Sequence, residues 1–138
     1  MAIPRSIQLQ IVSADRSLLN ETVDEVEIPG ADGYFGVLPG HTPLLAMLGA
    51  GELWYRKAQE KKYLLVSFGF AEVQPDRVTI LARIAENPGD IDVPRAQAAK
   101  KRAEERLMKP SIDIDAERAR VALLRSLARL QVATRAHR

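Results

Sequence analysis

Apolar and polar residues alternate along the first part of the chain with the period of two that half-buried β-strands show. The alternation recurs in five segments: residues 7–11, 23–28, 53–56, 63–73 and 78–82. The polar stretch between the third and fourth segments, residues 57–62, predicts a hairpin with a charged loop. Seven to ten short strands of this kind, with no helical pattern among them, predict a β-sandwich or flattened barrel.

The segment from residue 30 to residue 45 interrupts the alternation with closely spaced glycines and prolines. Neither a long helix nor a long strand tolerates so many of these residues. We therefore expect short extended pieces joined by tight turns, with glycine at the positions that need unusual backbone angles or close approach.

The pattern changes at residues 86–96, where several boundary signals coincide. Pro88 and Gly89 end the preceding strand, Asp92 is a favourable helix N-cap, and Pro94 falls in the first helical turn, where its missing N–H costs little. A β module therefore ends here and a helical arm begins.

We expect two domains, a β domain over residues 1–86 and an antiparallel two-helix hairpin over residues 87–138. The first predicted helix, residues 94–108, has a narrow stripe of mostly small residues. The second, which Asp113 or Asp115 can cap, has an apolar stripe made by Ala119, Leu123, Leu127 and Leu130 and a basic stripe made by Arg118, Arg125 and Arg129. Small facing residues bury little area, so the hairpin is expected to be the less stable half and able to open.

The charge of the chain is divided unevenly between these halves. Residues 1–93 hold 8 of the 20 lysines and arginines and 13 of the 18 aspartates and glutamates, which gives a formal charge of −5. Residues 94–138 hold the remaining 12 basic and 5 acidic residues, which gives +7. The arm is expected to seek an anionic contact: nucleotide phosphates, an acidic protein face or the chain's own β domain.

Composition argues against several classes of function. The chain has no cysteine and two histidines, which leaves little for nucleophilic catalysis or metal ligation, and it lacks phosphate-binding loop motifs. Aromatic residues are 5% of the chain and lie almost entirely in the β half, so a nucleic-acid binder would have no stacking platform on its basic helices. We expect no catalytic site, no metal site and no nucleic-acid partner.

Three motifs resemble a known family. Residues 33–45, which read Gly-Tyr-Phe-Gly-Val-Leu-Pro-Gly-His-Thr-Pro-Leu-Leu, resemble the signature of the ε subunit of the F-type ATP synthase. Residues 69–73, Gly-Phe-Ala-Glu-Val, resemble its second characteristic strand, and residues 91–96 resemble its nucleotide motif. The resemblance spans the whole chain, with one departure at Phe68, where many members carry Gly.

The resemblance implies a ten-stranded sandwich followed by a helical hairpin. It also implies a non-catalytic central-stalk subunit that couples the rotor to the catalytic head and needs no cofactor. The sandwich would dock on the γ subunit and the ring of membrane c subunits, and the extended arm would contact β and α subunits and block ATP hydrolysis. The subunit would be a peripheral membrane protein on the cytoplasmic side of the inner membrane. We expect no membrane insertion, because no apolar run reaches about 20 residues.

In some members of this family one ATP holds the hairpin folded, and the matching positions here are Glu86, Ile91, Asp92, Arg95, Ala96, Arg125 and Arg129. Arginines four residues apart share a helix face and can fork onto phosphate oxygens. The alternative is that Asp92 only caps a helix and the arginines form a solvated face. Both interpretations account for the motif.

The partner contacts implied by the resemblance fall on Tyr34, His41, Arg118, Arg125 and Arg129. The arginines of the second helix would meet an acidic segment of a β subunit. His41 has no acid, nucleophile or metal partner beside it in the sequence, so a hydrogen bond that fixes its loop is expected in place of catalysis.

Overall fold

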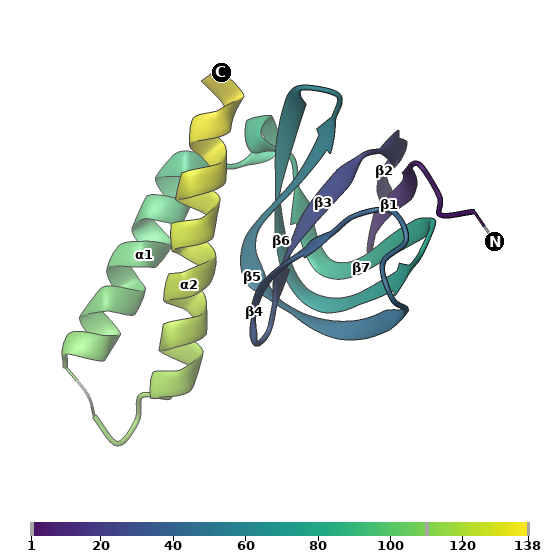
Figure 1. Cartoon of the computed structure of the whole chain (residues 1–138). Helices are drawn as coiled ribbons and strands as arrows, with labels where there is room; N and C mark the ends of the chain where they lie inside the picture. The colour runs from purple at the N-terminus through teal and green to yellow at the C-terminus, as the bar shows by residue number, and fades with distance from the viewer. Residues whose placement is uncertain (1, 110, 138) are drawn as a thin grey trace.

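The computed structural model of the chain describes residues 2–109 and 111–137. A β-sandwich forms the N-terminal part and a two-helix hairpin stands beside it, with α2 between α1 and the sandwich (Figure 1). The strands are β1 (Ile7–Ser13), β2 (Ser17–Val23), β3 (Glu25–Gly30), β4 (Gly33–Val37), β5 (Leu44–Lys57), β6 (Glu60–Gln74) and β7 (Arg77–Glu86). A short 3-10 helix η1 (Pro88–Asp90), the helices α1 (Val93–Met108) and α2 (Ala116–Ala133), and a final 3-10 turn η2 (Thr134–His137) follow.

One continuous sheet makes both layers of the sandwich, in the strand order β2-β1-β7-β6-β5-β3-β4. All neighbours are antiparallel except β1 and β7, which run parallel. The alternation predicted for residues 7–11 is confirmed, because Ile7, Leu9 and Ile11 are fully buried. These side chains meet those of the other layer in a single core.

The expected ten strands are wrong, since the described residues form seven. The reason is the length of β5 and β6, which have 14 and 15 residues and pair along almost their whole length. Each is one bent strand that passes through both layers, where the sequence pattern suggested separate short pieces. The predicted charged loop is likewise shorter, because residues 57 and 60 already pair and only two residues make the turn.

The bend in β6 has a specific backbone cause. Phe68 and Gly69 have φ angles of 56° and 122°, and the β5–β6 pairing is interrupted between the pairs Leu48–Gly69 and Ala50–Ser67 while its register stays the same. A Cβ on Gly69 would lie 1.9 Å from the Leu81 carbonyl oxygen, so only glycine fits there. The positive φ at Phe68 also gives a physical reason for the glycine that many family members carry at that position.

The helical hairpin buries the predicted apolar stripe only in part, since Ala119 is buried but Leu127 is not. Leu127, placed in the apolar stripe, is 43% exposed, and the buried residues of α2 are mainly small: Ala119, Ser126, Ala128, Val132 and Ala133. The reason is that α2 is covered on two sides, by α1 and by the sheet, so two narrow faces of small residues replace one leucine face. A predicted cap is confirmed at Asp115, which accepts a hydrogen bond from the Arg118 N–H at 3.1 Å.

The sheet ends at Glu86 and α1 begins at Val93. The division of the chain into domains of residues 1–86 and 87–138 stays a prediction, and residues 1, 110 and 138 lie outside the described part. Neither described helix is long and apolar enough to cross a membrane.

Candidate functional site

Four elements meet where the sandwich joins the hairpin: the end of β7, η1, the first turn of α1 and the last turns of α2. Asp92 caps α1, because its Oδ1 accepts the Arg95 backbone N–H at 3.1 Å. This bond satisfies one of the free amides at the helix start and sets the direction in which α1 leaves the sheet. The structure therefore shows Asp92 acting as the N-cap of α1.

A cavity of about 230 Å³ lies at this junction. Its lining consists of five of the predicted nucleotide residues and one other: Glu86, Asp90, Asp92, Arg95, Ala96 and Arg129. Arg129 Nε donates a hydrogen bond to Glu86 Oε1 at 2.8 Å, and both side chains are about three-quarters buried. The fold thus brings a residue of α2 against the end of β7, 43 positions earlier in the chain.

The other two predicted residues lie elsewhere. Ile91 is 8% exposed and packs with Leu65 and Val132 in the small cluster between the sheet and α2. Ile91 thereby anchors the short connection between η1 and α1. Arg125 is partly buried one helical turn before Arg129 and is not part of the lining.

Asp90 lines the cavity, and the sequence interpretation did not include it. Its Oδ2 lies 3.4 Å from Arg16 Nη2 and from Asn87 Nδ2. Arg16 precedes Asp90 by 74 residues, so no local pattern could have indicated the contact. The position of Asp90, two residues before Asp92, was a possible signal in the sequence. An aspartate in a Pro-Gly-Asp turn is also a common turn residue, however, so the signal was not specific.

The charges in the cavity place a condition on any anionic ligand. Three carboxylates face two guanidinium groups, and Arg129 is already paired with Glu86. A phosphate would therefore share or take over the Glu86 contact of Arg129, since a fork of N–H donors suits carboxylate and phosphate alike. Binding and opening of this ion pair would be coupled.

The residues predicted to contact partners are spread over both domains. Arg118 is exposed on α2, in line with Arg125 and Arg129. Tyr34 on β4 is 57% exposed, and its hydroxyl oxygen accepts the Glu52 backbone N–H at 3.1 Å. His41 Nδ1 lies 2.6 Å from the Thr42 carbonyl oxygen, in the loop between β4 and β5.

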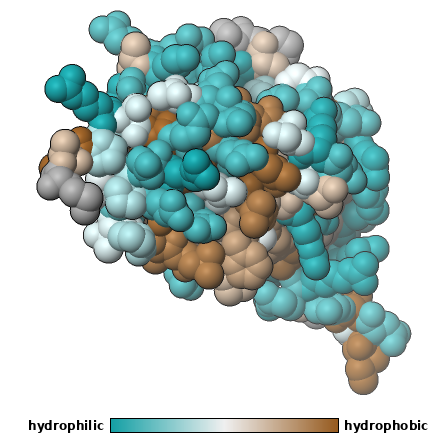
Figure 2. Space-filling view, turned by 90° about the vertical axis from the view of Figure 1, so that its right-hand side faces the viewer, coloured by the Kyte–Doolittle hydropathy of each residue, from teal (hydrophilic) through white to brown (hydrophobic). Residues whose placement is uncertain are grey.

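A row of exposed apolar side chains crosses three strands of the sandwich. Met47, Phe70 and Leu81 are direct neighbours on β5, β6 and β7, and about half or more of each is exposed. Leu45, on the same face of β5, is 70% exposed. The space-filling view shows hydrophobic surface among hydrophilic residues on the sandwich side of the molecule (Figure 2). Adjoining exposed apolar side chains of this kind are typical of protein–protein contact surfaces.

Comparison with known proteins places this geometry in a family. Residues 6–88 match the model of the ATP synthase delta/epsilon chain β-sandwich domain, and residues 90–134 match that of its long α-helix domain. The chain belongs to the ATP synthase delta/epsilon chain family. The resemblance inferred from the three sequence motifs is therefore confirmed.

Two curated relatives match along nearly their full length. The ATP synthase epsilon chain of Syntrophobacter fumaroxidans is 50% identical over 127 residues, which are 92% of this chain and 95% of the relative. The ATP synthase epsilon chain of Nitratidesulfovibrio vulgaris is 47% identical over 128 residues, 93% of this chain and 96% of the relative.

Solved structures agree with the fold. A chain in the Euglena gracilis mitochondrial ATP synthase structure that contains OSCP, F1 and the c-ring has a TM-score of 0.83 and 26% identity, covering 97% of this chain and 84% of its own length. A chain in the Tetrahymena thermophila central stalk and c-ring structure has a TM-score of 0.57 at 16% identity, with full coverage of both, and supports the fold alone.

Two substitutions of Asp92 distinguish the contribution of its capping hydrogen bond from the contribution of its negative charge. Asp92→Ala is expected to weaken the first turn of α1 by about 1 kcal/mol, whereas Asp92→Asn keeps an acceptor and costs only a few tenths. Amide hydrogen exchange of Arg95 and Ala96 measures the difference. Equal protection of these amides in both variants and the parent chain would contradict the capping role.

Proposed function

We propose that this chain is a non-catalytic ε subunit of the central stalk of an F-type ATP synthase. In this proposal the sandwich binds the γ subunit and the c-ring, and the helical arm regulates the catalytic head. The observation that carries it is the family match over both parts of the chain. The similar chain in the Euglena gracilis mitochondrial ATP synthase, a structure that contains the c-ring, supports the assignment to the rotor.

The apolar row on the sandwich supports rotor binding. Met47, Phe70 and Leu81 present neighbouring side chains on one face, and the signature segment with Tyr34 and His41 connects β3 to β5. Docking would remove this surface from water, which stabilises the complex by roughly 25 cal/mol for each Å² of apolar surface buried. The complex would then be peripheral to the membrane, on its cytoplasmic side.

The weak attachment of α2 supports a mobile arm. A small apolar cluster around Leu65, Ile91 and Val132 joins the arm to the sheet. Polar contacts add to it, chiefly the ion pairs of Arg129 with Glu86 and of Arg135 with Glu52. In the extended state, Arg118, Arg125 and Arg129 would meet an acidic segment of a β subunit and block ATP hydrolysis. Arg118 is exposed in the folded state and available for the first encounter.

Regulation by ATP follows if the nucleotide prefers the folded arm. The cavity around Arg95 and Arg129 exists only while Arg129 of α2 lies beside Glu86 at the end of β7, so a ligand held there would stabilise the folded arm. A ligand with equal affinity for both states would shift nothing. ATP would thus act as a regulatory ligand, with the arm acting as its sensor.

Removal of the arm tests the regulatory part of the proposal. A chain that ends at Val93 is expected to assemble and support proton-driven ATP synthesis, while ATP hydrolysis by the reconstituted complex rises several-fold. Arg118→Ala with Arg125→Ala is expected to raise hydrolysis as well. Arg120→Ala, whose partner Glu117 lies on the same helix, is the matched control and should change nothing. Loss of assembly on truncation would contradict the division between docking and regulation.

Calorimetric titration of ATP into the isolated chain tests the nucleotide site. Saturable binding is expected, and Arg125→Ala with Arg129→Ala should abolish it because the phosphates lose their fork-shaped donors. Arg120→Ala should bind like the parent chain. The absence of a binding heat up to about 1 mM ATP would mean a binding free energy weaker than roughly −4 kcal/mol. Asp92 would then act only as a helix cap, and the arm would not be a sensor of ATP.

A further inference from the structure

We propose that Arg135 and Glu52 form a latch that holds the helical arm on the sandwich at a point separate from the nucleotide cavity. The proposal deepens the regulation described above and rests on the mobile arm. It concerns η2, the last described turn of the chain, which follows α2 directly. None of the latch residues lines the cavity around Arg129.

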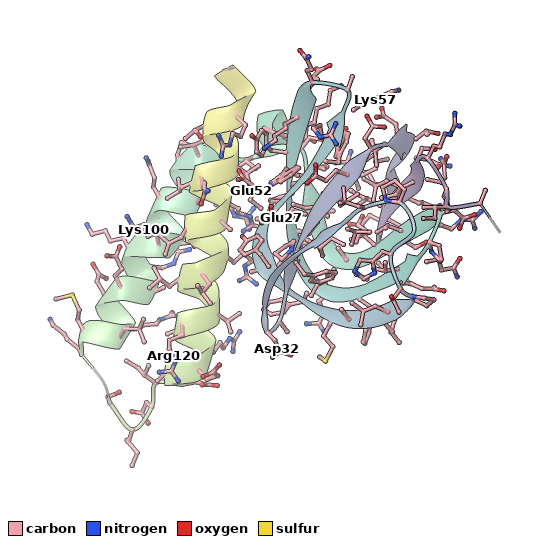
Figure 3. The ribbon with its side chains drawn as sticks, in the orientation of Figure 1. Glu27, Asp32, Glu52, Lys57, Lys100 and Arg120 are labelled. Atoms are coloured by element: carbon pink, nitrogen blue, oxygen red, sulfur yellow. The ribbon has the colours of Figure 1, made fainter. Side chains whose placement is uncertain are left out.

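Glu52 is a charged residue in an unusual place. It lies on β5 with only 7% of its surface exposed, between the sheet and α2 (Figure 3). A buried carboxylate is costly unless it is paired and hydrogen-bonded. Its backbone is fixed as well, because its N–H donates to the Tyr34 hydroxyl oxygen.

Arg135 supplies the missing partner from the arm. Its Nε donates to Glu52 Oε2 at 3.1 Å and its Nη2 donates to Glu52 Oε1 at 3.2 Å, which is a two-pronged ion pair. The guanidinium carbon also lies 4.1 Å from the centre of the Tyr63 ring on β6. Such pairing combined with aromatic stacking gives a directional contact that lysine would not reproduce.

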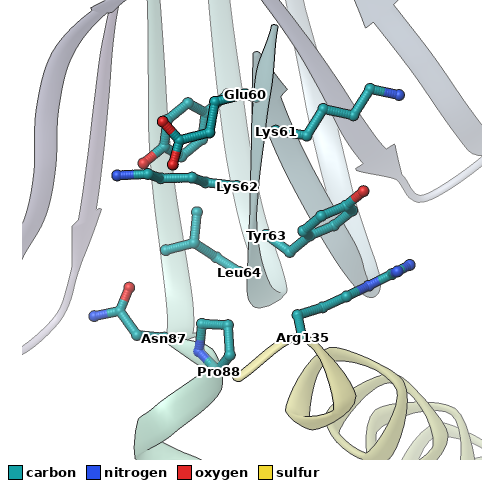
Figure 4. Close-up of a pocket in the computed structure, with 9 residues that line it drawn as sticks. Glu60, Lys61, Lys62, Tyr63, Leu64, Asn87, Pro88 and Arg135 are labelled. Atoms are coloured by element: carbon teal, nitrogen blue, oxygen red, sulfur yellow. The ribbon is translucent and has the colours of Figure 1, made fainter. Parts of the chain in front are cut away.

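The surroundings make this contact specific to the folded arm. Arg135 stands beside Tyr63 at the edge of a cavity of about 520 Å³, next to Asn87 and Pro88 (Figure 4). Gln131, on the preceding turn, places Nε2 3.5 Å from Glu52 Oε1. When α2 leaves the sheet, Glu52 loses all of these arm contacts at once.

The latch gives the arm a folded state that does not depend on nucleotide. Removing Arg135 alone is expected to destabilise the folded state of the arm, because it leaves Glu52 buried without its counter-charge. Removing both partners should cost no more than removing Arg135, since the two act as one unit.

Thiol labelling measures arm opening directly, because the chain has no cysteine. Ala128→Cys places one thiol in the buried contact between α2 and the sheet, where it reacts only when the arm opens. In this background, Arg135→Ala is expected to raise the labelling rate about tenfold, the effect of losing a strong charged hydrogen bond. Arg135→Lys should give an intermediate rate.

Three controls make the outcome decisive. Arg120→Ala should leave the rate within about twofold, since exposed pairs contribute little. Ala71→Cys, in the sandwich core, should label no faster when Arg135→Ala is added. Glu52→Gln combined with Arg135→Ala should be no faster than Arg135→Ala alone.

An unchanged rate at the Ala128→Cys thiol, or equal acceleration at the Ala71→Cys thiol, would overturn the latch. This result is independent of the inhibitory role, because it is obtained on the isolated full chain. Faster labelling together with unaltered hydrolysis in the truncated complex would support the latch and contradict the regulation.

Discussion

The contact between α2 and the outer face of β5 and β6 is the interaction on which this molecule depends. It is built from small residues around Leu65, Ile91 and Val132 and is closed at its two margins by ion pairs. Large leucines at this contact would attach the arm more firmly through burial alone. Small residues and ion pairs instead give an attachment whose strength depends on a few polar contacts.

The two long strands serve both halves of the structure. The first half of β5 and the second half of β6 carry Met47 and Phe70 of the apolar row. The second half of β5 and the first half of β6 carry Glu52 and Tyr63, which contact the arm. The bend at Phe68 and Gly69 lies between these regions. One pair of strands thus supports the exposed apolar row and, separately, the surface that contacts the arm. In the proposed function, the arm leaves the sheet without disturbing the apolar row.

Local patterns predicted the alternating strands, the joint at residues 86–96 and the caps Asp92 and Asp115, because these depend on neighbouring residues. The number of strands was missed because a bend in a continuous strand and a break between two strands look alike in sequence. Five of the seven predicted nucleotide residues line one cavity, while Ile91 and Arg125 do not, and nucleotide binding there stays a prediction. Asp90 with Arg16, and Glu52 with Arg135, were missed because each pair joins distant segments.

In the proposed function, the arm opens as a unit while the sandwich stays folded. Native-state hydrogen exchange on the isolated chain tests it most directly, because amides that open together share one free energy of exchange. We expect one common, lower free energy of exchange for the amides of α1 and α2, and a higher one for the amides of the core strands β1 and β7. Exchange of the α2 amides only at the free energy of global unfolding would contradict it.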